Sequence, residues 1–485
     1  MIITEDEGIE TSLDMDWVAS LEMKVSDTKI RRRNREPTIY RVPDTLKMVD
    51  HEAYEPRIVS LGPYHRDKPH LQAMNQLKWK YLKFVLHQNT GMVMKDYVGL
   101  IKKLETRTRD AYSEEAKMDS NSFVEMMLLD GCFLMLTIIG YDFSEERWTR
   151  NVAVRDILML ENQLPFFLLE TLYESAFPHF HRDHFRRLTV NFIGKRFSRN
   201  SSSFVLPSDN ETFHHIIHLS LSCIDPTTNH GNGNDGNGNG NGNDNGNHSS
   251  TFGFLCNSKL VKTVFVSLPS KLRSSLLPLV NKIRTCRDAN PEKDLFVSAF
   301  PWIPSATVCN EAGIYFKRKQ KAKSFLDITF HNGKVEIPQL YIGDRTNMLL
   351  RNLIAYEQCS TDSMLHVTSY MVLMNYLIDT AADVQLLQQQ EIIIGDVGHS
   401  QEIAILFNKL GMNVSYNSYK FYLVDVLNAM RKHHDTRRNK WRARLNRDYF
   451  SNPWAVISLI GALVLFLLTA LQSTFAVLSY FRPPK

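Results

Sequence analysis

A long uncharged stretch near the C-terminus constrains this chain more than any other feature. No Asp, Glu, Lys or Arg occurs from Tyr449 to Phe481, and the 25 residues Trp454–Leu478 within it are almost wholly apolar. As a helix, such a segment rises roughly 37 Å and can cross a hydrocarbon core of about 30 Å with some tilt. We therefore predict a single transmembrane helix at residues 454–480. A buried core helix is the weaker alternative, because soluble helices seldom run this long without a charge.

Basic residues precede this segment and few follow it. Arg482 and Lys485 are the basic residues after it, and eight stand before it: Arg431, Lys432, Arg437, Arg438, Lys440, Arg442, Arg444 and Arg447. The positive-inside rule then predicts that the large N-terminal body is cytosolic. Residues 431–453 form a basic juxtamembrane segment, which we expect to contact anionic lipid headgroups with about 1 kcal/mol per charge.

The charge balance of the rest of the chain argues against nucleic acid as a partner. The whole chain carries a net charge of +5, but residues 1–430 hold 47 Lys and Arg against 50 Asp and Glu. A body with a slight negative excess lacks the basic footprint of a nucleic-acid binder. Its length and apolar content are ample for a large core.

The cysteines and the N-terminus fit a cytosolic body. The first residues are acidic and lack the apolar core of a signal peptide, so we expect insertion after translation, as in a tail-anchored protein. The cysteines show no Cys-x-x-Cys spacing and are expected to be reduced and buried; they are Cys132, Cys223, Cys256, Cys286, Cys309 and Cys359. Four glycosylation sequons should stay unmodified in the cytosol: Asn200, Asn210, Asn247 and Asn413.

Periodicity predicts a mainly α fold with one small β-hairpin. Residues 324–342 alternate apolar and polar on both sides of Asn332-Gly333, which is the strongest short hairpin signal. The Asn- and Gly-rich run 229–247 cannot bury apolar surface and predicts a disordered insert. The predicted parts are an N-terminal helix and basic linker (1–36), a helical part (37–225), the insert (226–250), a second part with the hairpin (251–430), the juxtamembrane segment (431–453) and the transmembrane helix.

Several helices are predicted within these parts. The apolar run 126–139 is about 14 residues, too short to span a bilayer, and indicates a buried core helix. The other predicted helical segments are one from Trp17, 71–86, an amphipathic stretch from Asp156 to Tyr173, 347–356, 363–378 and 402–410.

An ordered series of motifs resembles one plant family. In the first half these are Ile39-Tyr-Arg-Val-Pro43, Tyr54-Glu-Pro56, Val59-Ser-Leu-Gly-Pro-Tyr-His65, Met127-Leu-Leu-Asp-Gly-Cys-Phe133 and Leu160-Glu-Asn-Gln-Leu-Pro-Phe-Phe167. In the second half they are Ala312–Lys317, Ser324–Ile328, Leu350–Cys359, Thr368–Tyr370 and Asn452-Pro-Trp454. The chain resembles the plant-specific family defined by domain of unknown function 247 (DUF247), from about Trp17 to its end.

The resemblance implies a membrane-associated plant protein with no established catalytic activity and no cofactor. Some members of the family resemble male determinants of self-incompatibility in grasses and act in pollen recognition. The expected function is therefore a non-enzymatic protein-interaction or recognition component with a protein partner not identified by the sequence.

Two acidic positions lie in apolar surroundings and allow a rival interpretation. Asp130 and the trio Glu161-Asn162-Gln163 place polar groups inside apolar helices. A pair of carboxylates with raised pKa values would suit acid/base work in a membrane-tethered hydrolase or transferase, together with His65. The alternative is that they hydrogen-bond buried backbone and determine helix packing, since unpaired burial costs several kcal/mol. An open pocket holding all three side chains would favour the enzyme, and separate burial would favour the interaction protein.

Other candidate motifs carry weaker signals, and we predict no catalytic, cofactor-binding or metal site. The histidines cluster at 179–184 and 214–218, and His214 and His218 have metal-ligand spacing, but surface histidines near loops explain both clusters better. Gly398-His-Ser-Gln-Glu402 lacks the final Gly of a nucleophile elbow. Arg31-Arg-Arg-Asn-Arg35 indicates a solvated linker rather than a nuclear signal or phosphate patch.

Overall fold

The computed structural model describes residues 15–27, 36–143, 147–197, 211–225, 302–322, 324–396, 399–416, 420–436 and 453–481. We call residues 36–436 within these ranges the body. The predicted insert 226–250, the Arg31–Arg35 run and most of the basic juxtamembrane segment lie outside the described residues.

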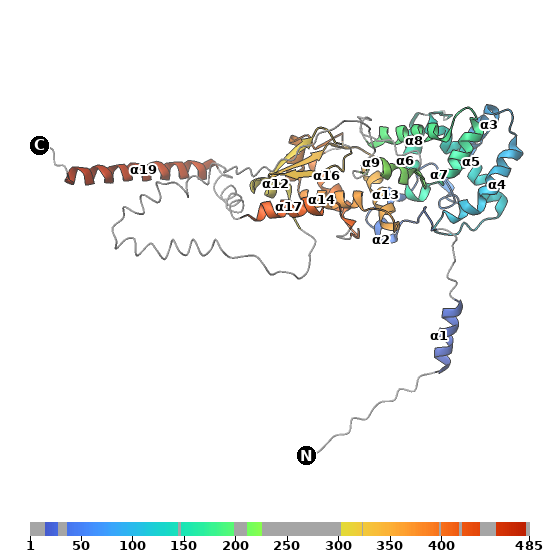
Figure 1. Cartoon of the computed structure of the whole chain (residues 1–485), viewed down its shortest axis with the longest axis horizontal. Coiled ribbons are helices and arrows are strands. Elements are labelled where there is room, and N and C mark those ends of the chain that lie inside the picture. The colour runs from blue at the N-terminus through green and yellow to red at the C-terminus, as the bar shows by residue number, and fades with distance from the viewer. Residues whose placement is uncertain are drawn as a thin grey trace, which may run out of the picture. The chain divides into compact units, whose positions relative to one another are not determined.

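The first half of the body is a cluster of helices around one buried helix (Figure 1). The helices and 3₁₀ turns are α2 (Asp44–Lys47), η1 (His51–Tyr54), η2 (Pro69–Leu71), α3 (Met74–Gln88), α4 (Met94–Asp110), α5 (Ser120–Ile139), α6 (Arg147–Ile157), η3 (Leu160–Asn162), α7 (Phe166–Ala176), α8 (Arg182–Phe197) and α9 (Ile216–Ile224). Helix α5 contacts α3, α4, α7 and α8. It is therefore the centre of the core.

Local sequence sets the two ends of α5. The Asp119 carboxylate accepts a hydrogen bond from the backbone N–H of Ser122 at 3.0 Å, which satisfies one of the free donors at the helix start. Gly140 adopts φ +106° just after the last turn, a conformation that favours glycine. Between these caps nearly every side chain is buried. The prediction of a buried core helix at 126–139 is confirmed.

The second half combines helices with two small sheets. Its elements are α12 (Ala306–Glu311), β1 (Tyr315–Lys319), β2 (Thr329–His331), β3 (Lys334–Pro338), β4 (Leu340–Ile342), α13 (Thr346–Cys359), α14 (His366–Leu377), α15 (Ala381–Gln389), β5 (Ile393–Gly395), α16 (Ser400–Leu410) and α17 (Val424–Asp435). The first sheet has the order β1-β3-β2, and the second pairs β4 with β5 in parallel. The prediction of a mainly helical body is confirmed, and α13, α14 and α16 match the predicted helices 347–356, 363–378 and 402–410.

The hairpin is confirmed in its turn but is shorter than predicted. Strands β2 and β3 pair antiparallel, and the turn between them places Asn332 at φ +50° and Gly333 at φ +78°. Strand β1 pairs with β3 in parallel, a long-range contact that local alternation cannot reveal. The prediction that 324–342 is one hairpin is wrong at its end, because Leu340–Ile342 pairs instead with β5, some fifty residues on.

One helix prediction in the first half is also wrong. The stretch from Asp156 to Tyr173 is not continuous: α6 ends at Ile157, η3 follows, and α7 begins at Phe166. Pro165 is the N-cap residue of α7, where its missing N–H removes no hydrogen bond of the helix. Its ring disfavours helical backbone at the preceding residue, so α7 cannot continue back toward η3. The break places Glu161, Asn162 and Gln163 on a buried turn rather than on a helix face.

Helix α13 joins the two halves. It contacts η1, η3 and α9 of the first half and α14 and α16 of the second. Asn352 is fully buried, and its amide accepts from the N–H of Leu160 at 2.8 Å and donates to the carbonyl of Ala53 at 2.9 Å. The two halves of the body therefore share one polar core.

Two helices bear on the membrane prediction. Within the described residues, Ser120–Ile139 alone is long and apolar enough to cross a membrane, and 83% of its apolar window is buried, so it is the core helix of the body. Helix α19 runs from Pro453 to Phe481, and the apolar stretch described within it, Ile460–Ala476, is shorter than a typical span of about 20 residues. Helix α1 (Met15–Asp27) matches the predicted N-terminal helix.

Candidate functional site

The motif Val59–His65 forms part of a non-helical segment in the core. We call residues 57–65 the buried loop. Val59, Leu61 and His65 are at most 2% exposed, and residues 55–68 contain no helix or strand. Buried backbone N–H and C=O groups outside regular structure need other partners. Side chains from four helical segments, α3, α5, α6 and η3, supply those partners.

Asp156 and Asn162 hold the first part of the buried loop. One carboxylate oxygen of Asp156 accepts from the backbone N–H groups of Arg57, Ile58 and Val59 at 2.9, 2.8 and 3.1 Å. The Asn162 amide accepts from Leu61 N at 2.6 Å and donates to the Val59 carbonyl at 3.0 Å. Burial raises the pKa of Asp156, while these backbone donors oppose that rise.

Asp130 and Lys78 hold the second part of the loop. Asp130 Oδ2 accepts from the N–H of Gly62 at 2.8 Å, and Lys78 Nζ donates to the carbonyl of Ser60 at 2.6 Å. The two side chains also form an ion pair with each other, at 2.5 Å between Oδ1 and Nζ. One buried pair of opposite charge thus satisfies a donor and an acceptor of the loop.

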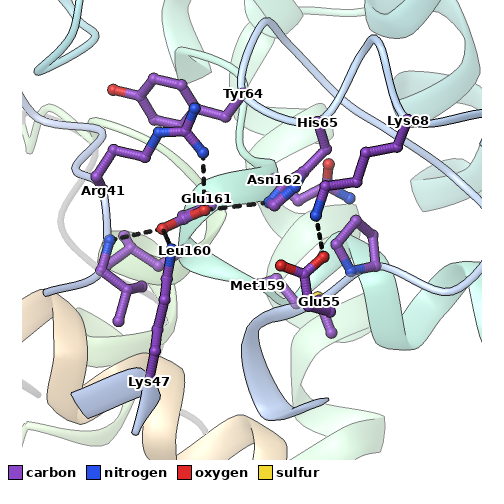
Figure 2. A network of polar contacts seen from close by, with 12 residues as sticks. Arg41, Lys47, Glu55, Tyr64, His65, Lys68, Met159, Leu160, Glu161 and Asn162 are labelled. Atoms are coloured by element: carbon purple, nitrogen blue, oxygen red, sulfur yellow. Dashed lines mark hydrogen bonds and ion pairs between the residues drawn. The ribbon is translucent and has the colours of Figure 1, made fainter. Parts of the chain in front are cut away.

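Glu161 lies at the centre of a second charged group (Figure 2). Its Oε1 accepts from Val42 N at 2.8 Å and lies 2.6 Å from Lys47 Nζ. Its Oε2 lies 3.1 Å from a guanidinium nitrogen of Arg41 and 3.3 Å from Nε2 of His65. We call Arg41, Lys47, His65 and Glu161 the Glu161 cluster. Its members come from the segment 41–47, the buried loop and η3.

The environment of Glu161 favours its ionised form. Burial by itself raises the pKa of this carboxyl and is the largest single influence, but His65, Lys47 and the Val42 N–H together outweigh it and lower the pKa to about 2. A carboxyl that acts as a general acid near neutral pH needs a raised pKa, which is the opposite of the shift at Glu161. The expectation of a raised pKa at Glu161 is therefore wrong.

His65 is the one member of the cluster with unsatisfied polar atoms. Both ring nitrogens are buried and make no hydrogen bond of good geometry, although Nε2 faces Glu161. Arg41 adds to this arrangement through its guanidinium, which lies 4.2 Å from the ring centre of Tyr64.

The two acids and His65 are deeply buried. Asp130 and Glu161 are 2% and 1% exposed, and His65 is 2% exposed. None of the three is among the residues that line three cavities in the described part of the body. Each carboxylate is engaged by cations and a backbone N–H group, Asp130 by Lys78 and the N–H of Gly62, and Glu161 by Arg41, Lys47 and the N–H of Val42. Both acids therefore hydrogen-bond buried backbone.

Sequence reasoning missed several residues of this network. Lys78, Asp156 and Asn352 supply as many contacts as the predicted acids. Tyr112 was also missed; its hydroxyl donates to the carbonyl of Gln163 at 3.0 Å. A polar residue within an apolar helical stripe was the available signal at Asn352 and Asp156. Such a residue indicates that the side chain is buried, but it does not show which group the side chain hydrogen-bonds.

The histidine clusters are only partly at the surface. His179 and His181 are exposed, but His215 is fully buried, and its Nε2 lies 2.9 Å from the carbonyl of Thr38. The expectation of surface histidines is therefore wrong for His215, which caps the start of α9. Among the described residues no group of three or more His, Cys, Asp or Glu could hold a metal.

The remaining candidates are placed as follows. Ser400 begins α16, and its hydroxyl donates to the Gln388 side chain at 3.0 Å. Cys132, Cys223 and Cys309 are free and buried, and Cys359 is free and half-buried, as expected for reduced thiols. Cys256 and Cys286 lie outside the described residues.

The fold and its buried network define a mainly helical protein with a polar network in its core, and comparison with known proteins places it in a family. The sequence pattern of DUF247, a plant protein family of unknown function, matches residues 39–468, and the chain belongs to this family. It is 29% identical over 92% of its length to a UPF0481 protein of Arabidopsis thaliana, of which 87% is covered. It is 25% identical over 96% of its length to a putative UPF0481 protein of the same plant, of which 95% is covered. No solved structure matches the chain.

Proposed function

We propose that this protein is a membrane-anchored, non-enzymatic protein-interaction or recognition component. The observation that carries the proposal is the state of its buried acids. Asp130 and Glu161 are each engaged by cations and a backbone N–H group, both are at most 2% exposed, and neither lines the three cavities described in the body. A hydrolase or transferase built on these carboxylates needs them open to substrate.

Helix α19 is the proposed anchor. It is continuous over 29 residues, and its described side chains are exposed and mostly apolar, with an apolar stretch at Ile460–Ala476. Exposed apolar side chains along this stretch are costly in water and stable in a hydrocarbon core. Insertion of α19 into a bilayer provides the environment that its side chains require.

The proposed topology places the body in the cytosol, with the basic segment at anionic headgroups. Arg431 and Lys432 near the end of α17 begin the run of basic residues that precedes α19. Basic residues on the cytosolic side of a membrane helix are the expected bias. Glycosidase treatment of the protein from plant cells tests this. A mobility shift of the protein caused by a glycan on Asn413, an exposed sequon, would place the body on the other side of the membrane.

The specific form of the proposal is a role in recognition, with pollen self-incompatibility as the example from the family. Affinity purification from native membranes, followed by mass spectrometry, tests the interaction function. We expect protein partners that copurify with the parent and not with α19 alone fused to an unrelated protein. Turnover of a hydrolysable substrate by purified protein that Glu161→Gln abolishes without unfolding would overturn the proposal.

A further inference from the structure

Two cavities adjoin on one face of the body. The first, of about 330 Å³, lies among the residues 36–40, α9 and the turn between α13 and α14, and we call it the acidic cavity. The second, of about 380 Å³, lies beside Arg107, Phe167 and Phe213, and we call it the aromatic cavity. They share Glu36, Thr38 and His214 as lining residues. Each has the size of a small ligand pocket, roughly 300 Å³ or more.

Carboxylates dominate the charge of the acidic cavity. Glu36 and Asp362 stand exposed at its rim, where the Thr361 hydroxyl lies 3.5 Å from one carboxylate and 3.4 Å from the other. Glu211 and Asp225 add two further carboxylates, and no Lys or Arg is among its described lining residues. Glu357 also lines the cavity, and burial raises the pKa of its carboxyl to about 7. The Nζ of Lys420 lies nearby but donates to two backbone carbonyls of the 361–363 turn.

The histidines of this cavity do not cancel its negative charge. His214 and His218 stack with ring centres 4.5 Å apart, and the pKa of each is lowered by burial, that of His218 to about 4. Burial likewise lowers the pKa of His366, whose Nδ1 lies 3.4 Å from Asp225. Near neutral pH these imidazoles are uncharged, and the cavity presents carboxylates beside aromatic rings.

Aromatic surfaces line both cavities. In the acidic cavity the rings of Tyr40 and Tyr356 have centres 6.2 Å apart. In the aromatic cavity the Arg107 guanidinium lies 3.7 Å from the centre of the Phe167 ring, which shows that this face already accommodates a stacked cation. A guanidinium or ammonium group between carboxylates and aromatic rings gains from both contacts.

We propose that these adjoining cavities bind an extended basic peptide segment of a protein partner, with a Lys or Arg side chain in the acidic cavity and an apolar side chain in the aromatic cavity. This rests on the proposed interaction function and names the chemistry of the partner. Charge complementarity selects the occupant. Four carboxylates near one cavity repel the phosphates of nucleic acid and of anionic lipid, and they attract a cationic side chain.

The test uses the full-length protein in detergent micelles and fluorescence anisotropy. The probe is a short fluorescein-labelled peptide that alternates arginine with leucine and glycine, and its control carries citrulline in place of each arginine. The test variant is Glu36→Gln with Asp362→Asn, both at exposed rim positions. The matched control is Glu115→Gln with Asp67→Asn, two exposed acids away from the cavities that make the same change in net charge.

We expect saturable binding of the arginine peptide below roughly 1 mM, at least about tenfold weaker binding to the rim variant, and unchanged binding to the control variant. The melting temperatures of both variants should match the parent. Equal weakening in both double variants would show a general charge effect and overturn the proposal. Equal binding of the citrulline peptide, or no binding of either peptide, would overturn it as well.

Copurification separates this inference from the proposed function. If no protein copurifies with the parent, the interaction function itself fails. If partners copurify equally with the parent and the rim variant, the interaction function stands and the assignment of its site to these cavities is wrong. Loss of a partner in the rim variant, together with retention in the control variant, supports both.

Discussion

Lys78 Nζ lies 2.5 Å from Asp130 Oδ1, and the two side chains are 4% and 3% exposed. An ion pair this deeply buried is not a simple gain in stability, because both charges lose their hydration. Each partner also binds the buried loop, Asp130 at the N–H of Gly62 and Lys78 at the carbonyl of Ser60. The pair therefore serves to hold a non-helical segment inside a helical core.

Removal of one member of this pair should be strongly destabilising. We expect Lys78→Met to lower the free energy of unfolding by roughly 3–5 kcal/mol, because it leaves the Asp130 charge buried without its cation. Lys78→Met with Asp130→Asn should cost less than the sum of the two single changes. Chemical denaturation of the four proteins in a double-mutant cycle measures this coupling. Additive losses would show that the two charges act independently.

Glu161 should make the protein more stable above pH 4.5 than in strong acid. Its pKa is lowered in the folded state from the ordinary 4.5 to about 2, so the folded state holds the ionised form more strongly than the unfolded state does. This stability is present above pH 4.5 and is lost as pH falls toward 2, in total on the order of 3 kcal/mol. Unfolding free energies at several pH values should show this loss in the parent and not in Glu161→Gln.

Glu357 should have the opposite effect in a higher pH range. Burial is the main cause that raises its pKa to about 7, against hydrogen bonds from Val367 N at 2.8 Å and Thr368 N at 2.7 Å. The folded state therefore prefers the protonated form. The contribution is complete below pH 4.5 and is lost as pH rises through 7, on the order of 3 kcal/mol.

The check is the difference in melting temperature between the parent and Glu357→Gln across pH 4–8. We expect the parent to lose stability relative to the variant as pH rises through this range. A constant difference would mean that Glu357 keeps the same protonation state in the folded and unfolded chains. Glu161→Gln serves as the control, since its own effect lies below pH 4.5.

Gly62 should tolerate no side chain. It adopts φ +71°, and a Cβ placed there would lie 2.6 Å from the hydroxyl of Tyr112 and 3.2 Å from the carbonyl of Gln163. We expect Gly62→Ala to cost at least about 2 kcal/mol, from the left-handed backbone and the clash together. Tyr112→Phe should recover part of the loss in the double variant. Gly99→Ala in α4 is the control, since a Cβ there meets nothing within 4 Å, and it should be neutral or stabilising.

Truncation before Ser451 should release the protein from membranes. The proposal assigns attachment to the apolar surface of α19, and the upstream basic residues alone give salt-sensitive binding. Fractionation of cells that express the truncated and full-length chains, with a high-salt wash, measures this. Truncated protein that stays in the membrane pellet after the wash would show a second attachment site and contradict the anchor assignment.

The sequence by itself determined the elements that depend on nearby residues. Helix α5 is a largely apolar helix between an Asp cap and a Gly cap, and the β2–β3 turn depends on Asn332 and Gly333, which accept positive φ. Such features are encoded within a few residues, because helix caps and tight turns are local hydrogen-bond and steric problems. The family motifs were equally visible in the sequence, although their purpose was not.

Only the tertiary structure decided what the buried polar residues do. Asp130 and Glu161 had the same sequence signal, an acid in apolar surroundings, yet Asp130 pairs with Lys78 and Glu161 with Arg41 and Lys47. Glu161 lies 120 residues from Arg41 along the chain. Only the packing of whole helices brings residues with such a sequence separation into contact. A buried charge is stable only with a partner, and which partner it meets is set by the fold as a whole. The cavities beside Thr38 arise in the same way, since they are bounded by segments that are far apart in the sequence.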